Sequence, residues 1–153
     1  MASQTKNEAK TGTTAAVPAA YSQMRTKFEA YTGDEPYLFV SYSHKDTAAV
    51  YPILDALYDR KYRIWYDESC ENGNDFRDEL RHRIEKSEAV LLFVSRNSMT
   101  SPFCGMEIIV ARENNKRLYP IFLDNVEVPP AFAILLSNTH HGTVDDVERL
   151  LRA

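Results

Sequence analysis

Ala89-Val90-Leu91-Leu92-Phe93-Val94-Ser95 gives the clearest strand pattern in this 153-residue chain. A short run of consecutive apolar residues predicts a strand that is buried on both faces, as the strands of a parallel sheet are. Similar runs occur at residues 37–41, 63–66 and 117–123. Pro120 in the last run lacks an amide proton, so it should weaken the hydrogen-bond ladder locally. We predict these four strands and a brief fifth strand near residues 140–144.

Helices are predicted between these strands. Asp46 or Thr47 can cap a helix after the first strand, and Asp75 can cap a helix after the second. The apolar stripes of these two helices contain Val50, Ile53, Leu54 and Leu57, and Phe76, Leu80 and Ile84. A third helix surrounds Glu107 and runs to about Asn115. The remaining helices are expected near residues 131–136 and from Asp145.

The alternation of strands and helices with short connections predicts an α/β fold in which helices cover both faces of a parallel sheet. We expect a flavodoxin-like three-layer sandwich with a five-stranded parallel sheet in the order 2-1-3-4-5. Residues 35–153 make up this domain. Residues 1–34 are predicted to be a disordered or partly helical leader, since residues 1–20 are mostly Ala, Thr, Lys and Ser and residues 21–31 allow a short helix.

The composition argues against several kinds of partner. Basic and acidic residues are mixed along the chain and the net charge is -4, so no nucleic-acid-binding surface is expected. No apolar run approaches the roughly 20 residues of a membrane span, and no secretory signal is recognisable. The two cysteines, Cys70 and Cys104, favour a reducing cytoplasm over a disulfide framework. The four histidines lack metal-ligand spacing, so no metal site is predicted.

Ligands of such sheets bind at the carboxyl ends of the strands. That edge carries residues 41–46, 67–74 and 95–98, and the Glu107 helix begins nearby. A flavin-binding protein would need a Gly-rich phosphate loop, and residues 41–46 contain no glycine. A phosphoacceptor response regulator would end its third strand in Asp, where this chain has Ser95. A Rossmann-type dinucleotide fold would show G-x-G-x-x-G after the first strand, and the sequence has none.

Glu107 stands in an otherwise apolar stripe of its helix. Phe103 lies four residues earlier on the same helix face, and Met106 and residues 108–110 surround the acid in sequence. A carboxylate among apolar neighbours must be paired, neutralised or used on a ligand. The local pattern also fits a surface glutamate at the edge of an amphipathic helix. Cys104, with no histidine paired to it, is expected to be a small buried residue rather than a nucleophile.

Several segments taken together resemble Toll/interleukin-1 receptor (TIR) domains. They are residues 39–46; residues 64–67 with Gly73 and Phe76; residues 87–98 followed by residues 101–104 and Glu107; and residues 119–121. The segments occur in the order and at the spacing of the family, from about residue 37 to residue 147. Their Ser-x-Ser-His-Lys-Asp style is similar to that of bacterial members.

The resemblance implies an enzyme that cleaves NAD+. Glu107 occupies the position of the family's key acid and is the implied catalytic residue. NAD+ would be the substrate, with no cofactor, and the products would be nicotinamide and either ADP-ribose or a cyclic ADP-ribose isomer. The implied substrate-binding residues are Phe103, Ser41, Tyr42, Ser43, His44 and Lys45. Phe103 stands where the family often carries Trp and could stack on a base, but it fits a core position equally well. His44 and Lys45 also fit ordinary solvated loop residues, which is the more common role.

The acidic loop after the second strand corresponds to the segment that TIR domains use for self-association. Its residues are Asp67, Glu68, Glu71, Gly73 and Asp75. A homo-oligomer is therefore implied, although a solvated loop explains the same residues. The resemblance also implies a part in bacterial anti-phage signalling, in which this chain is either the whole effector or the source of a product that a separate effector protein senses. The alternative function is a non-catalytic TIR scaffold or adaptor that acts by homotypic association. A weaker alternative is a virulence protein that mimics the TIR contacts of a host.

Overall fold

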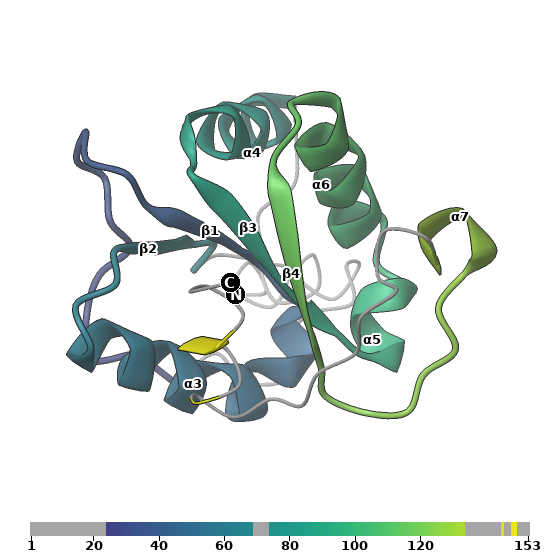
Figure 1. Cartoon of the computed structure of the whole chain (residues 1–153), viewed down its shortest axis with the longest axis horizontal. Coiled ribbons are helices and arrows are strands. Elements are labelled where there is room, and N and C mark those ends of the chain that lie inside the picture. The colour runs from purple at the N-terminus through teal and green to yellow at the C-terminus, as the bar shows by residue number, and fades with distance from the viewer. Residues whose placement is uncertain (1–23, 69–73, 134–144, 146–147, 150–153) are drawn as a thin grey trace, which may run out of the picture.

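The structure of the chain is a computed structural model that describes residues 24–68, 74–133, 145 and 148–149. Figure 1 shows a sheet with helices on both faces. The strands are β1 (Leu38–Ser41), β2 (Ile64–Tyr66), β3 (Ala89–Val94) and β4 (Arg117–Phe122). The helices are η1 (His44–Asp46, a 3-10 turn), α3 (Thr47–Asp59), α4 (Asn74–Lys86), α5 (Arg96–Met99), α6 (Pro102–Glu113) and α7 (Pro130–Ala133).

The four strands form one parallel sheet in the order β2-β1-β3-β4. Val40 of β1 lies beside Tyr66 of β2 and Leu91 of β3, and Val94 at the end of β3 lies beside Phe122 of β4. The predicted α/β fold with a parallel sheet is confirmed, and the order agrees with the first four strands of the prediction. The predicted fifth strand near residues 140–144 lies outside the described residues.

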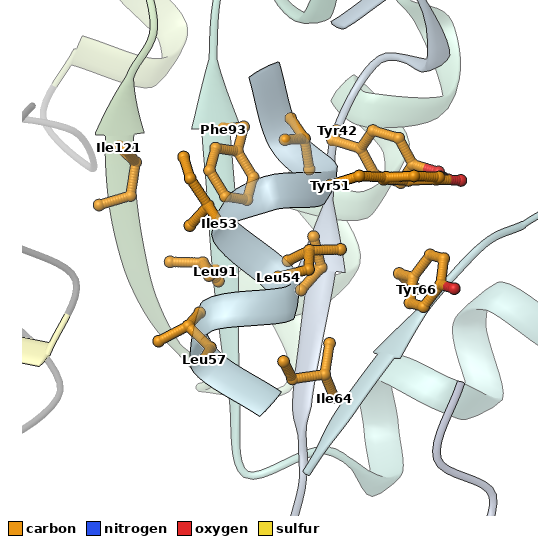
Figure 2. Close-up of a cluster of buried hydrophobic side chains, with 12 residues drawn as sticks. Tyr42, Tyr51, Ile53, Leu54, Leu57, Ile64, Tyr66, Leu91, Phe93 and Ile121 are labelled. Atoms are coloured by element: carbon orange, nitrogen blue, oxygen red, sulfur yellow. Dashed lines mark hydrogen bonds between the residues drawn. The ribbon is translucent and has the colours of Figure 1, made fainter. Parts of the chain in front are cut away.

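The core consists of one apolar layer on each face of the sheet. Residues of the sheet alternate between the two layers, as the period of a strand requires. Val40, Leu91 and Phe93 pack against Leu54 and Leu57 of α3 (Figure 2). On the opposite face, the sheet residues Phe39, Trp65 and Val90 pack against Leu80 and Ile84 of α4 and Val110 and Ala111 of α6. The three-layer arrangement explains why the strands read as continuous apolar runs.

Several predicted helix caps and element boundaries differ from those in the structure. The third strand ends at Val94, because Ser95 and Ser98 form a reciprocal capping box that begins α5, a helix that the sequence analysis does not predict. Asp46 precedes α3, but its side chain makes no capping hydrogen bond there. Asp75, the predicted cap of the next helix, is the second residue of α4, which begins at Asn74. The α6 helix ends at Glu113, two residues before the expected end.

Residues 24–31, here called the N-terminal strap, pack on α3 and β2 instead of forming the short helix expected there. Partly buried and exposed residues alternate along the strap, which is the period of an extended chain. The Phe28 ring stacks on Tyr58 with 4.5 Å between centroids and meets Tyr66 edge-on. The Tyr31 amide donates to the Ile64 carbonyl at 2.8 Å. The described part of the expected leader is therefore bound to the domain.

None of the helices in the described residues combines the length and the apolar character that crossing a membrane requires.

Candidate active site

Ser41 and Glu107 meet at the carboxyl edge of the sheet. Ser41 is the last residue of β1, and its Oγ donates a hydrogen bond of 2.6 Å to Oε1 of Glu107. Both side chains are buried, with Glu107 only 6% exposed. The interpretation of Glu107 as a surface residue is therefore wrong. A carboxyl group held beneath the surface at this edge lies where α/β sheets bind their ligands.

The start of α6 determines the direction of Glu107. Ser101 caps the helix by accepting a hydrogen bond from the Cys104 amide, and Pro102 occupies the first turn, where its missing amide proton costs nothing. Ile108 packs beneath β3 against Leu92 and Val94. Glu107 directly precedes Ile108 in this helix. Its carboxyl group points inward to the end of β1 rather than to solvent.

Burial controls the titration of the two buried ionisable groups of this helix, Cys104 and Glu107. It raises the pKa of the Glu107 carboxyl to about 8, while the hydrogen bond from Ser41 lowers this pKa and the charge of Asp67 raises it. Burial also raises the pKa of the Cys104 thiol to about 12, with a further contribution from Glu107. The thiolate form of Cys104 is thus suppressed, and the prediction that Cys104 is a buried residue is confirmed.

The loop after β1 is fastened to the residue that follows β2. The Tyr42 hydroxyl donates to the Asp67 carbonyl at 2.7 Å, and Nε2 of His44 lies 3.1 Å from the same oxygen. Nε2 of His44 is also 3.5 Å from the Asp67 carboxylate. Ser43 is buried and accepts from the Lys45 amide at the start of η1, whereas the Lys45 side chain is exposed. Of the predicted substrate-binding loop, Tyr42, Ser43 and His44 therefore have structural partners.

Asp46 is a residue of this edge to which the sequence analysis gives no role beyond that of a possible helix cap. Its carboxylate accepts hydrogen bonds from the Ser95 hydroxyl and from Nδ2 of Asn97, the latter at 2.8 Å. These partners follow β3, about 50 residues further along the chain. Asp46 thus joins the loops after β1 and β3. The sequence signal that could have identified this contact is an acidic side chain after β1 together with the amide side chain of Asn97 after the neighbouring strand β3.

The family assignment follows from a match between the TIR domain model and residues 38–151. The chain belongs to the TIR domain family. Glu107, Ser41 and the loops after β1, β2 and β3 all lie within the matched segment of this TIR domain. No curated protein matches the sequence.

Solved structures of other TIR domains share the fold. The TIR domain of the Toll-related receptor TRR-2 from Hydra magnipapillata is 16% identical, with a TM-score of 0.60, over 75% of this chain and 91% of that one. A metazoan TIR-STING receptor from C. gigas is 24% identical, with a TM-score of 0.61, over 82% of this chain and only 44% of that one. A chain of the RPS4 and RRS1 TIR domain heterodimer is 14% identical, with a TM-score of 0.52, over 77% of this chain and 94% of that one. At these identities the likeness concerns the fold alone.

The aromatic residue before Glu107 belongs partly to the core of the TIR domain. Phe103 is partly buried and packs against the apolar layer between the sheet and the helices α4 and α6. The guanidinium carbon of Arg77 lies 5.8 Å from the centroid of its ring. A cation over the ring face adds an electrostatic attraction to the packing. Phe103 therefore has a structural role, and its stacking on a base stays a prediction.

The acidic loop is described only at its ends. Asp67 contacts the loop after β1, as above, and the Glu68 carboxylate accepts from the Ala30 amide of the N-terminal strap at 3.2 Å. Asp75 lies in α4, and Glu71 and Gly73 lie outside the described residues. Asp67 is thus placed beside the candidate active site, at the edge where the sequence analysis expects residues 67–74, and its predicted part in self-association stays a prediction.

Two cavities lie at the opposite edge of the sheet, where the strands begin. The larger one, about 630 Å³, is bordered by residues 32–37 and by the end of α4 with Ser87 and Glu88. The smaller one, about 310 Å³, lies between the starts of β1, β2, β3 and β4. Neither is lined by Ser41 or Glu107. Within the described part of the chain, no three His, Cys, Asp or Glu side chains are grouped as a metal ion would need.

Proposed function

We propose that this TIR domain is an NAD+ glycohydrolase that releases nicotinamide from NAD+, with Glu107 as the catalytic residue. The observation that supports the proposal best is the buried Glu107 carboxyl group at the carboxyl edge of the sheet, bonded to Ser41. Placing a carboxyl group there costs folding free energy, because burial disfavours its charge. Such a cost is expected where the group serves chemistry.

The chemistry gives an ionised Glu107 a defined task. When the bond between nicotinamide and C1 of the ribose breaks, its electron pair leaves with the nicotinamide nitrogen and positive charge develops on the sugar. A carboxylate in a water-poor site stabilises that oxocarbenium-like centre and can accept hydrogen bonds from the ribose hydroxyls. Attack by water at C1, with loss of one proton, gives ADP-ribose. Attack by a group of the same ADP-ribose unit gives a cyclic isomer.

The substrate contacts are proposed from residue chemistry. Lys45 is an exposed cation at the carboxyl edge and is suited to the pyrophosphate of NAD+. Phe103 lies one helical turn before Glu107, and we propose that its ring stacks on nicotinamide or adenine. Tyr42, Ser43 and His44 shape the same side of the site. NAD+ is the substrate in this scheme, and the reaction needs no cofactor.

The proposed biological setting is cytoplasmic immune signalling in a bacterium. Copies of the chain would assemble through contacts of residues 67–75, and association between TIR domains is seen in the RPS4 and RRS1 heterodimer. The reaction would either deplete NAD+ or supply a product that acts on a separate effector. This setting rests on the bacterial style of residues 41–46 and on membership of the TIR domain family.

The test is to incubate concentrated protein with NAD+, with and without a crowding agent, and to separate nicotinamide, ADP-ribose and cyclic isomers by chromatography with mass spectrometry. We expect release by the natural chain and a loss of at least about 100-fold in Glu107→Gln. Glu113→Gln, a change on the exposed side of the same helix, is the matched control and should retain activity. Full activity in Glu107→Gln would overturn the assignment of the catalytic residue.

A non-catalytic scaffold is the second candidate function. The observation that favours it is the closure of the site, since a side chain that is 6% exposed must move or be uncovered before a substrate reaches it. Light scattering on the same samples separates the two candidates. Assembly without nicotinamide release would establish the scaffold, and release that depends on Glu107 would exclude it.

A further inference from the structure

The Ser41 hydroxyl is already committed to Glu107. Ser41 is 1% exposed, and its Oγ donates to Oε1 of Glu107 at 2.6 Å. A serine hydroxyl has one proton to donate. While that proton is shared with Glu107, Ser41 cannot donate it to a ribose hydroxyl or a phosphate oxygen of a substrate. With its proton used and almost no surface exposed, Ser41 is placed to act on Glu107 rather than to donate to a substrate.

The backbone holds Ser41 in this position. Ser41 ends β1, which is flanked by strands on both sides, and it pairs with Leu92 of β3. Leu92 is itself buried and packs against Ile108 of α6. Because the strand and the helix are packed together, the Ser41 hydroxyl is a fixed point against which the flexible Glu107 side chain is oriented.

We propose that Ser41 is a positioning residue that holds the Glu107 carboxyl group in place and supports its ionised form, rather than a residue that contacts NAD+. The part of this inference that concerns NAD+ rests on the proposed function. The part that concerns Glu107 does not, since it describes a bond between two groups of the chain.

The charge of Asp67 acts on Glu107 in the opposite direction to Ser41. Asp67, which follows β2, repels a negative charge on Glu107, and the same carboxylate faces the imidazole of His44. Cys104, on α6 itself, responds to Glu107, whose charge raises the pKa of its thiol. Ser41 therefore offsets both burial and the Asp67 charge, and removing its hydroxyl should leave Glu107 harder to ionise.

The direct test is the titration of Glu107 by carbon-13 NMR in protein labelled at its glutamate carboxyl groups, without NAD+. The Glu107 resonance is assigned by its disappearance in Glu107→Gln. We expect the pKa of Glu107 to rise by about one unit in Ser41→Ala, since the hydrogen bond from Ser41 favours the ionised form of the carboxyl group. Ser41→Thr keeps the hydroxyl and should restore the natural value. Ser87→Ala removes another buried serine hydroxyl, bonded to the Ile84 carbonyl far from Glu107, and should leave the titration unchanged.

The second readout is the pH profile of nicotinamide release. In Ser41→Ala the rise of kcat/KM with pH should move upward by about one unit while KM stays the same. An unchanged Glu107 titration in Ser41→Ala would overturn the proposal. If KM also rises in that case, Ser41 is a substrate contact instead. If the natural chain does not cleave NAD+, the proposed function fails but the titration still decides the role of Ser41. If Ser41→Ala does not fold, Ser41→Cys, a weaker donor of similar size, takes its place in both experiments.

Discussion

Replacing Glu107 by glutamine should change how the folding stability depends on pH. In the natural chain the pKa of Glu107 is raised from 4.5 to about 8, mainly by burial. Between these two values the folded chain retains a proton that the unfolded chain has lost. The free energy of unfolding therefore falls as pH rises, in contrast to the common case of a carboxylate with a depressed pKa. Glutamine keeps the size and the Oε1 acceptor for Ser41 but has no proton to lose.

The magnitude follows from the difference between the two pKa values. From 4.5 to about 8, at about 1.4 kcal/mol per pKa unit, the greatest possible effect is about 5 kcal/mol. Relaxation of the surroundings and entry of water reduce such effects, so we expect about 3 kcal/mol. The stability of Glu107→Gln relative to the natural chain should thus increase by about 3 kcal/mol from pH 4 to pH 9, and the increase should begin near pH 4.5 and end by about pH 8.

Urea unfolding of both proteins at each pH, followed by circular dichroism, measures this difference. Titrations shared by the two proteins cancel, and only the contribution of Glu107 is left. Glu113→Gln is the control, because Glu113 lies on the same helix with its side chain 59% exposed and pairs with Arg81 at 3.7 Å. Its stability difference should stay within about 0.5 kcal/mol at every pH. A flat curve for Glu107→Gln, or one that falls with pH, would refute the reasoning.

Three further changes test other contacts of the fold. Phe28→Ala should lower the free energy of unfolding by about 2 kcal/mol, because the ring stacks on Tyr58; a loss below about 0.5 kcal/mol in urea unfolding would show that the strap contributes nothing. In a Cys70→Ser background, Cys104 should react with iodoacetamide at pH 8 at least about 100-fold more slowly than the unfolded protein does, since burial raises its pKa to about 12; mass spectrometry measures the labelling, and rapid modification of the native protein would contradict the burial. Asp46→Ala should cost about 2 kcal/mol, because two hydrogen bonds to a carboxylate are lost; an unchanged urea midpoint would mean that the loops after β1 and β3 hold together without it.

The strands were predictable because their environment leaves a simple trace in the sequence. Residues 89–94 are buried on both faces, so nearly every position is apolar and no alternation is visible. The N-terminal strap shows the reverse case. Met24, Thr26, Phe28 and Ala30 are partly buried in alternation with exposed residues, but the strap has too few large apolar side chains for this period to stand out. Its packing depends on rings that come from α3 and β2.

The candidate site was predictable in position and not in its bonds. The resemblance to TIR domains selects Glu107, and the topology places it at the carboxyl edge of the sheet. The partner of Glu107 is 66 residues away in sequence, so only the folded chain reveals that Ser41 donates to it. Asp46 illustrates why local patterns mislead here. An acid before a helix is read as a cap, but hydrogen bonds from Ser95 and Asn97 occupy its carboxylate.

The strap determines how a force applied on the N-terminal side of residue 24 enters the domain. Tension applied from that side is not transmitted first to β1. It loads the Lys27–Asp59 ion pair on α3 and the stacked rings of Phe28 and Tyr58, and then the contact between Ala30 and Glu68. Glu68 is adjacent to Asp67, which is fastened to the loop beside Glu107. A pull on the N-terminal side of the chain therefore loads α3 and β2 through Phe28, and the contact of Ala30 with Glu68 connects the strap to the rim of the candidate active site.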